Sequence, residues 1–199
     1  MATNMKALRD RIAAEGRNLG SGILKIDSLL NHQIYPQLMY EMGEEMARRF
    51  ADVKVDRILT AEISGIAPAL MTGYVLKVPV VYARKTKPIT MFGPVFLETA
   101  PSHTKGGEVN LLVSAEFLLP DQDVLIIDDF LASGQTLRAL VRMVDGARSR
   151  VAGVGVVVEK TFEGGRNFMR SKGYTMPIEA LCTIVSMDNG SIQFSEEDV

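Results

Sequence analysis

Residues 124–136 read Val-Leu-Ile-Ile-Asp-Asp-Phe-Leu-Ala-Ser-Gly-Gln-Thr. The opening apolar residues have the composition of a buried strand, two adjacent carboxylates follow them, and a turn of small residues then leads into a helical pattern. In that pattern the apolar residues recur at helical spacing, at Leu137, Leu140, Val141 and Val144. The order of strand, acid pair, turn and helix is typical of a βα unit in a parallel sheet.

Similar units lie on both sides of this stretch. Short runs rich in Val and Ile occur at 57–59, 78–82 and 151–158. A second amphipathic helix is indicated by the apolar stripe Met39, Met42, Met46 and Phe50, which we interpret as core packing. The alternation predicts an α/β fold with a central, mainly parallel sheet flanked by helices.

The turn after the acid pair has the features of a phosphate site. Backbone N–H groups at a helix N-terminus lack partners and favour an anion, and Gly134 lets the backbone approach it closely. The residues that would form this cradle are Ala132, Ser133, Gly134, Gln135 and Thr136. Asp128 and Asp129 cannot bind phosphate themselves, but they can accept hydrogen bonds from vicinal ribose hydroxyls, directly or through Mg²⁺. The alternative is an acidic loop that is solvated or caps the helix.

Composition excludes several other classes of protein. The Walker A and Rossmann glycine patterns are absent, and a formal net charge of -2 without blocks of like charge gives no nucleic-acid footprint. One cysteine, Cys182, allows neither an internal disulfide nor a cysteine metal cluster. No signal-peptide or membrane-spanning run is visible. We therefore expect one domain over 1–199, without nucleic-acid or membrane partners, in the cytoplasm.

The stretch 85–117 differs from the rest of the chain because its apolar residues follow no helical period. Glycines and prolines interrupt it, at Pro88, Gly93, Pro94, Pro101, Gly106 and Gly107. We expect a long irregular excursion here, of the kind that serves as a lid.

The block around the acid pair is similar to the motif with which type I phosphoribosyltransferases bind phosphoribosyl pyrophosphate (PRPP), and the resemblance extends from about residue 5 to residue 194. It implies that family's fold, with an N-terminal hood over about 1–35 and a flexible flap over about 86–117. In that family Asp128 and Asp129 would hold the ribose hydroxyls and residues 132–136 the 5′-phosphate. It also implies Mg²⁺ carried mainly by PRPP rather than by a separate protein metal site.

The same resemblance assigns a pyrophosphate site and a dimer. Ser64 and Gly65 begin a helix one βα unit upstream of the acid pair, at the position of the family's pyrophosphate loop. Arg84 and Lys85 are candidates for neutralising the leaving group, and some members place such a residue across a homodimer interface. Residues 102–105, Ser-His-Thr-Lys, resemble the flap tip, and we interpret His103 as an exposed residue rather than a base.

Three further residues resemble the base site of the xanthine-using branch of the family. Leu24 and Asn31 match the hood residues that pack on the base and hydrogen-bond it. Lys160, an ammonium that only donates hydrogen bonds, would favour a 6-oxopurine over adenine. Position 132 is Ala where many hypoxanthine-guanine enzymes have Asp. The resemblance thus implies transfer of the phosphoribosyl group to xanthine in purine salvage; hypoxanthine, guanine or adenine as substrate, and a non-catalytic PRPP sensor, are the alternatives.

Overall fold

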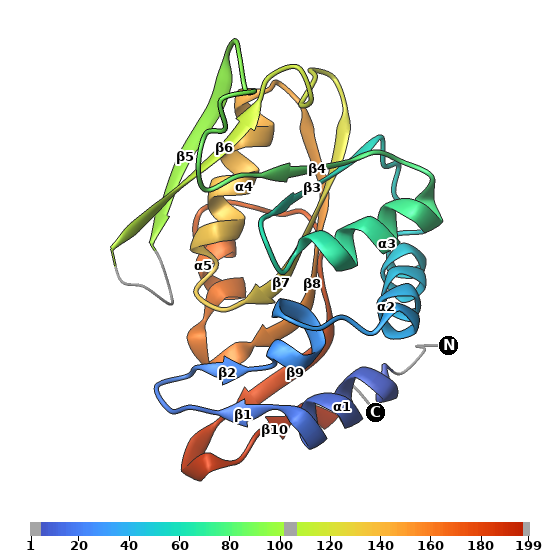
Figure 1. Cartoon of the computed structure of the whole chain (residues 1–199), viewed down its shortest axis with the longest axis vertical. Helices are drawn as coiled ribbons and strands as arrows, with labels where there is room; N and C mark the ends of the chain where they lie inside the picture. The colour runs from blue at the N-terminus through green and yellow to red at the C-terminus, as the bar shows by residue number, and fades with distance from the viewer. Residues whose placement is uncertain (1–4, 102–106, 197–199) are drawn as a thin grey trace.

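A six-stranded β-sheet forms the centre of the fold (Figure 1). The computed structural model describes residues 5–101 and 107–196. In spatial order the strands are β10 (Gln193–Phe194), β9 (Ile178–Ser186), β8 (Arg150–Lys160), β7 (Asp123–Leu131), β3 (Arg57–Ala61) and β4 (Val80–Ala83). The strands from β9 to β4 are parallel to their neighbours, and β10 is antiparallel to β9. The predicted α/β fold with a mainly parallel sheet is confirmed.

Helices cover both faces of this sheet (Figure 1). One face packs against α2 (Pro36–Arg49) and α3 (Ile66–Leu76), and the other against α4 (Gln135–Gly146) and α5 (Gly165–Ser171). Side chains along β7 alternate between the two layers: Leu125 and Ile127 join the first cluster, Val124 and Ile126 the second. A strand buried on both faces is apolar at every position, which explains the continuous run in the sequence.

The order of the strands creates a topological switch point between β3 and β7. From β3 the chain passes through α3 to β4 on one side, whereas from β7 it passes through α4 to β8 on the other. At such a point the connections that follow two neighbouring parallel strands lead away to opposite sides, so the loops at the carboxyl ends of the strands separate. α/β proteins bind ligands between these loops. The loop after β3 and the acid pair on β7 meet at this switch point.

Residues 5–35 lie across one end of the sheet, where the resemblance implies the hood, and this segment is called the hood below (Figure 1). It contains α1 (Lys6–Glu15), β1 (Arg17–Asn18), β2 (Leu24–Lys25) and the short π-helix η1 (Asp27–Asn31). Its apolar side chains, including Leu29 and Leu30, belong to the same buried cluster as Val158 of β8. Short 3-10 segments follow β8 and β9, as η2 (Thr161–Glu163) and η3 (Asp188–Gly190).

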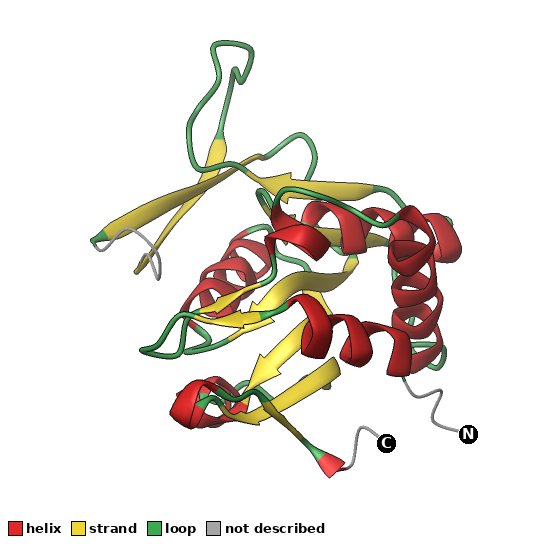
Figure 2. Ribbon diagram, turned by 60° about the horizontal axis from the view of Figure 1, so that its bottom comes forward, coloured by secondary structure: helices red, strands yellow, loops and turns green. Residues whose placement is uncertain are grey.

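The prediction of an irregular stretch over 85–117 is wrong for much of it. β5 (Val95–Pro101) and β6 (Glu108–Ser114) form an antiparallel hairpin that extends away from the sheet (Figure 2). The turn residues lie at the strand ends, with Pro94 before β5 and Gly107 before β6, so they delimit the strands rather than interrupt them. The hairpin is anchored to the core by one face, on which Ala100, Leu111 and Val113 are buried.

In the part of the chain that the structure describes, no helix is long and apolar enough to cross a membrane.

Candidate active site

The acid pair lies on β7 where one edge of that strand is open. Pairing between β3 and β7 ends at Leu59 and Ile126, whereas β8 continues to pair with β7 as far as Leu131. The carboxylates are therefore part of the strand and not of a loop beyond it, which corrects the boundary that the sequence indicated. Since β8 supports the backbone on the far side, Asp128 and Asp129 are held rigidly beside the switch point.

Both carboxylates are electrostatically strained. Asp128 is only 5% exposed, and burial raises the pKa of its carboxyl well above the ordinary value, with a further increase from the charge of Asp129. Burial also raises the pKa of Asp129, although hydrogen bonds from Ser64 and from the backbone of Phe130 lower it in part. A cation or a set of hydroxyl donors between the two groups would relieve this strain, because either one stabilises the ionised forms.

The turn after β7 leads directly into α4. Gly134 has a φ of 80°, in the left-handed region that favours glycine, and its carbonyl accepts the first helical hydrogen bond from Arg138 at 2.9 Å. A Cβ at this position would lie 3.0 Å from the carbonyl oxygen of Gly165, so the turn also packs closely on α5. The N-cap residue of α4 is Gly134 itself, which has no side chain to cap the helix. An anion is favoured at this helix N-terminus.

The loop between β3 and α3 faces the acid pair. A Cβ on Gly65 would lie 2.3 Å from Thr60 Oγ1 and 2.9 Å from Asp128 Oδ1, so only glycine lets the loop approach this closely. The hydroxyl of Ser64 lies 3.2 Å from Asn31 Oδ1 and also interacts with Asp129; its single proton is donated to one of these two acceptors at a time. A cis peptide bond joins Glu62 and Ile63. The structure therefore brings Ser64 and Gly65 to the acid pair, as the sequence indicated.

The two basic candidates after β4 occupy different environments. Lys85 is exposed, its backbone N–H donates to Glu62 Oε1 at 2.6 Å, and its charge lowers the pKa of both carboxyls against the larger effect of burial. Arg84 instead joins the hairpin, exchanging backbone hydrogen bonds of 2.8 Å with Leu112. Its Nε is buried, and no described atom forms a hydrogen bond with it. Lys85 is thus the basic candidate whose charge acts on both carboxyls of the acid pair.

Lys160 ends β8 and is almost completely buried, at 9% exposure. Its ammonium donates to the carbonyl oxygen of Gly22 in the hood at 2.8 Å, forms an ion pair with Glu163, and lies 5.6 Å from the ring centre of Phe130. Lys160 is thus not a surface lysine, and the adjacent Glu159 pairs with Arg166 instead. Lys160 therefore connects the hood to the strand next to the acid pair.

The hood supplies Leu24 and Asn31. Leu24 is buried in the first core cluster, and Phe130 packs against that same cluster. Asn31 is exposed, yet both ends of its amide are bonded, Oδ1 to Ser64 and Nδ2 to Asp27 Oδ1 at 3.2 Å. The link through Ser64 joins the hood to the loop after β3, two segments that are 33 residues apart in the chain.

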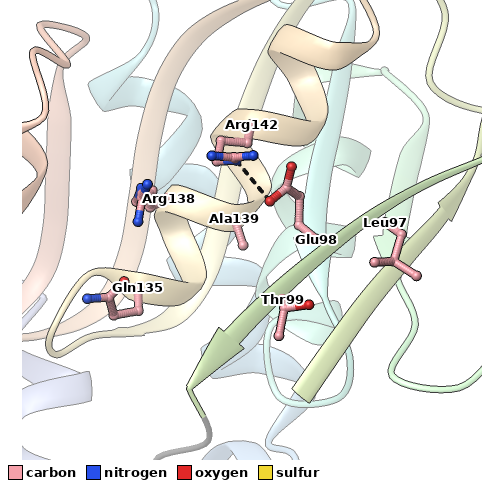
Figure 3. Close-up of a pocket in the computed structure, with 7 residues that line it drawn as sticks. All are labelled: Leu97, Glu98, Thr99, Gln135, Arg138, Ala139 and Arg142. Atoms are coloured by element: carbon pink, nitrogen blue, oxygen red, sulfur yellow. Dashed lines mark ion pairs between the residues drawn. The ribbon is translucent and has the colours of Figure 1, made fainter. Parts of the chain in front are cut away.

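A cavity of about 310 Å³ lies between α4 and the hairpin (Figure 3). It is lined by Gln135, Arg138 and Arg142 of α4 and by Leu97, Glu98 and Thr99 of β5. Arg142 and Glu98 form an ion pair of 2.9 Å across it. The side chain of Gln135 thus faces this cavity, and that ion pair fastens the hairpin to the helix whose N-terminus forms the turn. The predicted flap tip, residues 102–105 with His103, lies outside the described residues.

Four residues near the site were not identified from the sequence: Asp27, Thr60, Phe130 and Glu163. Two of them carried a usable signal, because Asp27 precedes Asn31 by four residues and Glu163 follows Lys160 by three, the spacings at which helical side chains meet. Thr60 gave none; its hydroxyl is buried and bonded to no described atom. Phe130 was part of the motif but carries no polar chemistry.

Asp128 and Asp129 are also the groups that could bind a metal ion. Among residues 5–101 and 107–196 no group of three or more His, Cys, Asp or Glu side chains could hold an ion. Two adjacent carboxylates still fit Mg²⁺, which binds proteins through one or two carboxylates and takes its other ligands from phosphate and water. The residues present thus suit a Mg²⁺ ion that arrives with a phosphorylated ligand.

Comparison with known proteins agrees with this geometry. The family model described as phosphoribosyl transferase domain matches residues 26–196. A xanthine phosphoribosyltransferase of Deinococcus deserti is 53% identical over 94% of this chain and 95% of its own length, and one of Lactobacillus helveticus is 44% identical over 98% and 100%. The adenine phosphoribosyltransferase structure of Thermoanaerobacter pseudethanolicus superimposes with a TM-score of 0.72 at 22% identity, over 90% of this chain and 99% of that one, and supports the fold. The chain belongs to the phosphoribosyltransferase family.

Proposed function

We propose that the protein transfers the 5-phosphoribosyl group from PRPP to xanthine, giving xanthosine 5′-monophosphate and pyrophosphate, as a purine-salvage enzyme. The observation that carries the proposal is the position of Ser64, whose hydroxyl contacts Asn31 of the hood and also Asp129 of the acid pair. A sugar held by the acid pair and a base held by the hood would therefore meet at the switch point. Xanthine phosphoribosyltransferases of nearly equal length support the same choice of substrate.

PRPP would lie at the switch point between β3 and β7. Its 5′-phosphate binds the turn 132–136, because the uncapped N-terminus of α4 stabilises negative charge. Its ribose hydroxyls donate to Asp128 and Asp129. Its pyrophosphate lies near Ser64 and Gly65, with Arg84 and Lys85 as the basic groups that compensate the charge of the leaving group.

Mg²⁺ is the cofactor that we propose with PRPP. When bound, it would neutralise charge on the pyrophosphate and on the acid pair. The protein would contribute carboxylate oxygens, and the phosphorylated substrate would supply most of the remaining ligands.

The base would lie between the hood and the end of β8. Leu24 packs on its ring, Asn31 hydrogen-bonds its 2-oxo edge, and the ammonium of Lys160 donates to its 6-oxo group. A ring nitrogen that has lost its proton to water then attacks the anomeric carbon while the bond to pyrophosphate breaks and pyrophosphate leaves. Adenine fits poorly, because its 6-amino group presents N–H donors to an ammonium that can only donate.

The test is a PRPP-dependent assay with xanthine, hypoxanthine, guanine and adenine in parallel, following loss of the base and release of pyrophosphate. We expect xanthine to have the highest kcat/KM. Equal turnover of hypoxanthine would refute the choice of xanthine but leave the reaction intact. PRPP binding without turnover of any base would instead support a PRPP sensor.

We further propose a homodimer that acts in the cytoplasm. Tyr74 and Leu70 of α3 are 71% and 52% exposed, beside the edge strand β4 with Tyr82 at 42%, and apolar side chains grouped in this way are common in subunit interfaces. A single cysteine suits a reducing compartment. Light scattering of wild type and of Tyr74→Lys tests the homodimer: the wild type should have twice the monomer mass, and the variant should dissociate to monomers.

A further inference from the structure

The amide of Asn31 lies between two polar groups with opposite requirements. Its Nδ2 is 3.2 Å from Asp27 Oδ1, and its Oδ1 is 3.2 Å from the hydroxyl of Ser64. Asp27 and Asn31 are the first and last residues of η1. The backbone holds this spacing, because the N–H groups of His32 and Gln33 both donate to the carbonyl of Asp27 at 2.9 Å.

This arrangement determines which end of the amide faces Asp27. An ionised carboxylate accepts hydrogen bonds but donates none, so the nitrogen of Asn31 must face it and the oxygen must face Ser64. Lys25 favours the ionised form of the carboxylate, with its ammonium 2.7 Å from Asp27 Oδ2. Hydrogen bonds from Lys25 and then from Asn31 lower the pKa of Asp27, which agrees with this charge state.

An amide held in this way keeps its remaining groups in fixed places. One N–H of Nδ2 is directed to Asp27 and one lone pair of Oδ1 to Ser64, so one N–H and one lone pair remain, each at its own end of the amide. Xanthine and guanine share the 6-oxo group and differ at the 2-position, where xanthine carries an oxo group and guanine an amino group. With its nitrogen toward the 2-position the amide pairs with the oxo group of xanthine and meets another donor in guanine, whereas an amide turned over would present its oxygen there and accept from the amino group.

We propose that Asp27 is a specificity-determining positioning residue, whose carboxylate holds the Asn31 amide in the orientation that accepts a 2-oxopurine and rejects a 2-aminopurine. The inference rests on the proposed function, because it requires that Asn31 contacts the base. Asp27 itself does not touch the base; it acts through the hydrogen bond to Asn31.

The test is Asp27→Asn, assayed with xanthine and with guanine at saturating PRPP. An amide at position 27 presents either a donor or an acceptor, so the Asn31 amide is free to turn over. We expect the ratio of kcat/KM for xanthine to that for guanine to fall about 10-fold or more, the size of one hydrogen-bond mismatch. The KM for PRPP and the melting temperature should stay close to wild type.

Two further variants separate this role from a general effect on the hood. Lys25→Met removes the ion pair but leaves the carboxylate, so the ratio should stay within about twofold, in the range of exposed ion pairs. Asp27→Asn combined with Asn31→Asp exchanges donor and acceptor, so the pair should now favour guanine.

The outcomes are distinguishable. If wild type turns over no xanthine with PRPP, both the proposed function and this inference are wrong. If wild type uses xanthine and folded Asp27→Asn keeps the wild-type ratio, the inference alone is wrong. It is equally overturned if Lys25→Met lowers the ratio as much as Asp27→Asn does.

Discussion

Replacing Asp128 by Asn should make the protein more stable and at the same time unable to hold PRPP tightly. The side chains have nearly the same shape, so the substitution fits beside Gly65 without a new clash. It removes a carboxylate that is 5% exposed and whose ionised form is disfavoured by burial and by the neighbouring Asp129. Such relief of strain at a functional site is worth on the order of 1 kcal/mol, or about 2–4 °C in melting temperature for a chain of this size.

The pH dependence identifies the cause. The pKa of Asp128 is raised in the folded protein, so the folded state binds this proton more tightly than the unfolded state does. Wild-type stability therefore falls as the pH rises from the unfolded pKa through the raised folded value. Asp128→Asn lacks this loss, so its advantage should be greatest near pH 8 and disappear near pH 4. Each unit of pKa difference corresponds to about 1.4 kcal/mol.

The loss of binding should be large. A hydrogen bond from a ribose hydroxyl to a charged acceptor contributes about 1.5–3 kcal/mol, so affinity for Mg²⁺-PRPP should fall about 10- to 150-fold. Thermal unfolding from pH 4 to 8.5 and titration calorimetry with Mg²⁺-PRPP measure the two effects. Asp52→Asn is the matched control at an exposed position and should change neither. Lower stability of Asp128→Asn at pH 8, or unchanged PRPP affinity, would refute the reasoning.

Three further substitutions test other parts of the site. Lys160→Met leaves the Glu163 carboxylate and the Gly22 carbonyl without their hydrogen-bond partner, so the free energy of unfolding should fall by about 1–3 kcal/mol. Kinetic assays should show a KM for xanthine raised about 10-fold or more and an unchanged KM for PRPP. Gly65→Ala places a Cβ 2.3 Å from a buried hydroxyl, which should cost about 1–3 kcal/mol in chemical denaturation; Gly146→Ala, with contacts no closer than 3.5 Å, is the control that should not. Glu98→Gln breaks the ion pair with Arg142, so hydrogen exchange in β5 and β6 should rise severalfold while overall stability changes by less than about 1 kcal/mol; unchanged exchange would contradict the fastening role.

The sequence predicted those features in which neighbouring residues cooperate. The strand, acid pair, turn and helix of 124–136 form a continuous stretch, and the structure contains them in that order. The roles of Leu24, Asn31 and Lys160 at the base came from resemblance and stay predictions. Their surroundings were outside the reach of sequence reasoning, since Lys160 contacts a carbonyl 138 residues away in the chain.

The hairpin shows a different limit. Its strands are only partly buried: residues 111–114 of β6 are covered on both faces, whereas most of β5 is partly or fully exposed. The apolar runs are therefore short, and the prolines and glycines determined the interpretation of 85–117. Arg84 is similar: beside Lys85 it was expected to neutralise the leaving group, yet the backbone of Arg84 pairs with Leu112 of the hairpin. Local composition carries no information about which distant strand will pair with a given backbone.

The amino-acid sequence by itself determined the alternation of strands and helices, the position of the acid pair, and the turn that starts α4, because hydrophobic period and turn chemistry act over a few residues. Only the tertiary structure decided that the pairing of β3 with β7 ends at Leu59 and Ile126, that Ser64 lies between the hood and the acid pair, and that Asn31 donates to Asp27. These depend on strand order and on hydrogen bonds of about 3 Å between distant segments. Such contacts form only once the whole sheet has brought those segments together.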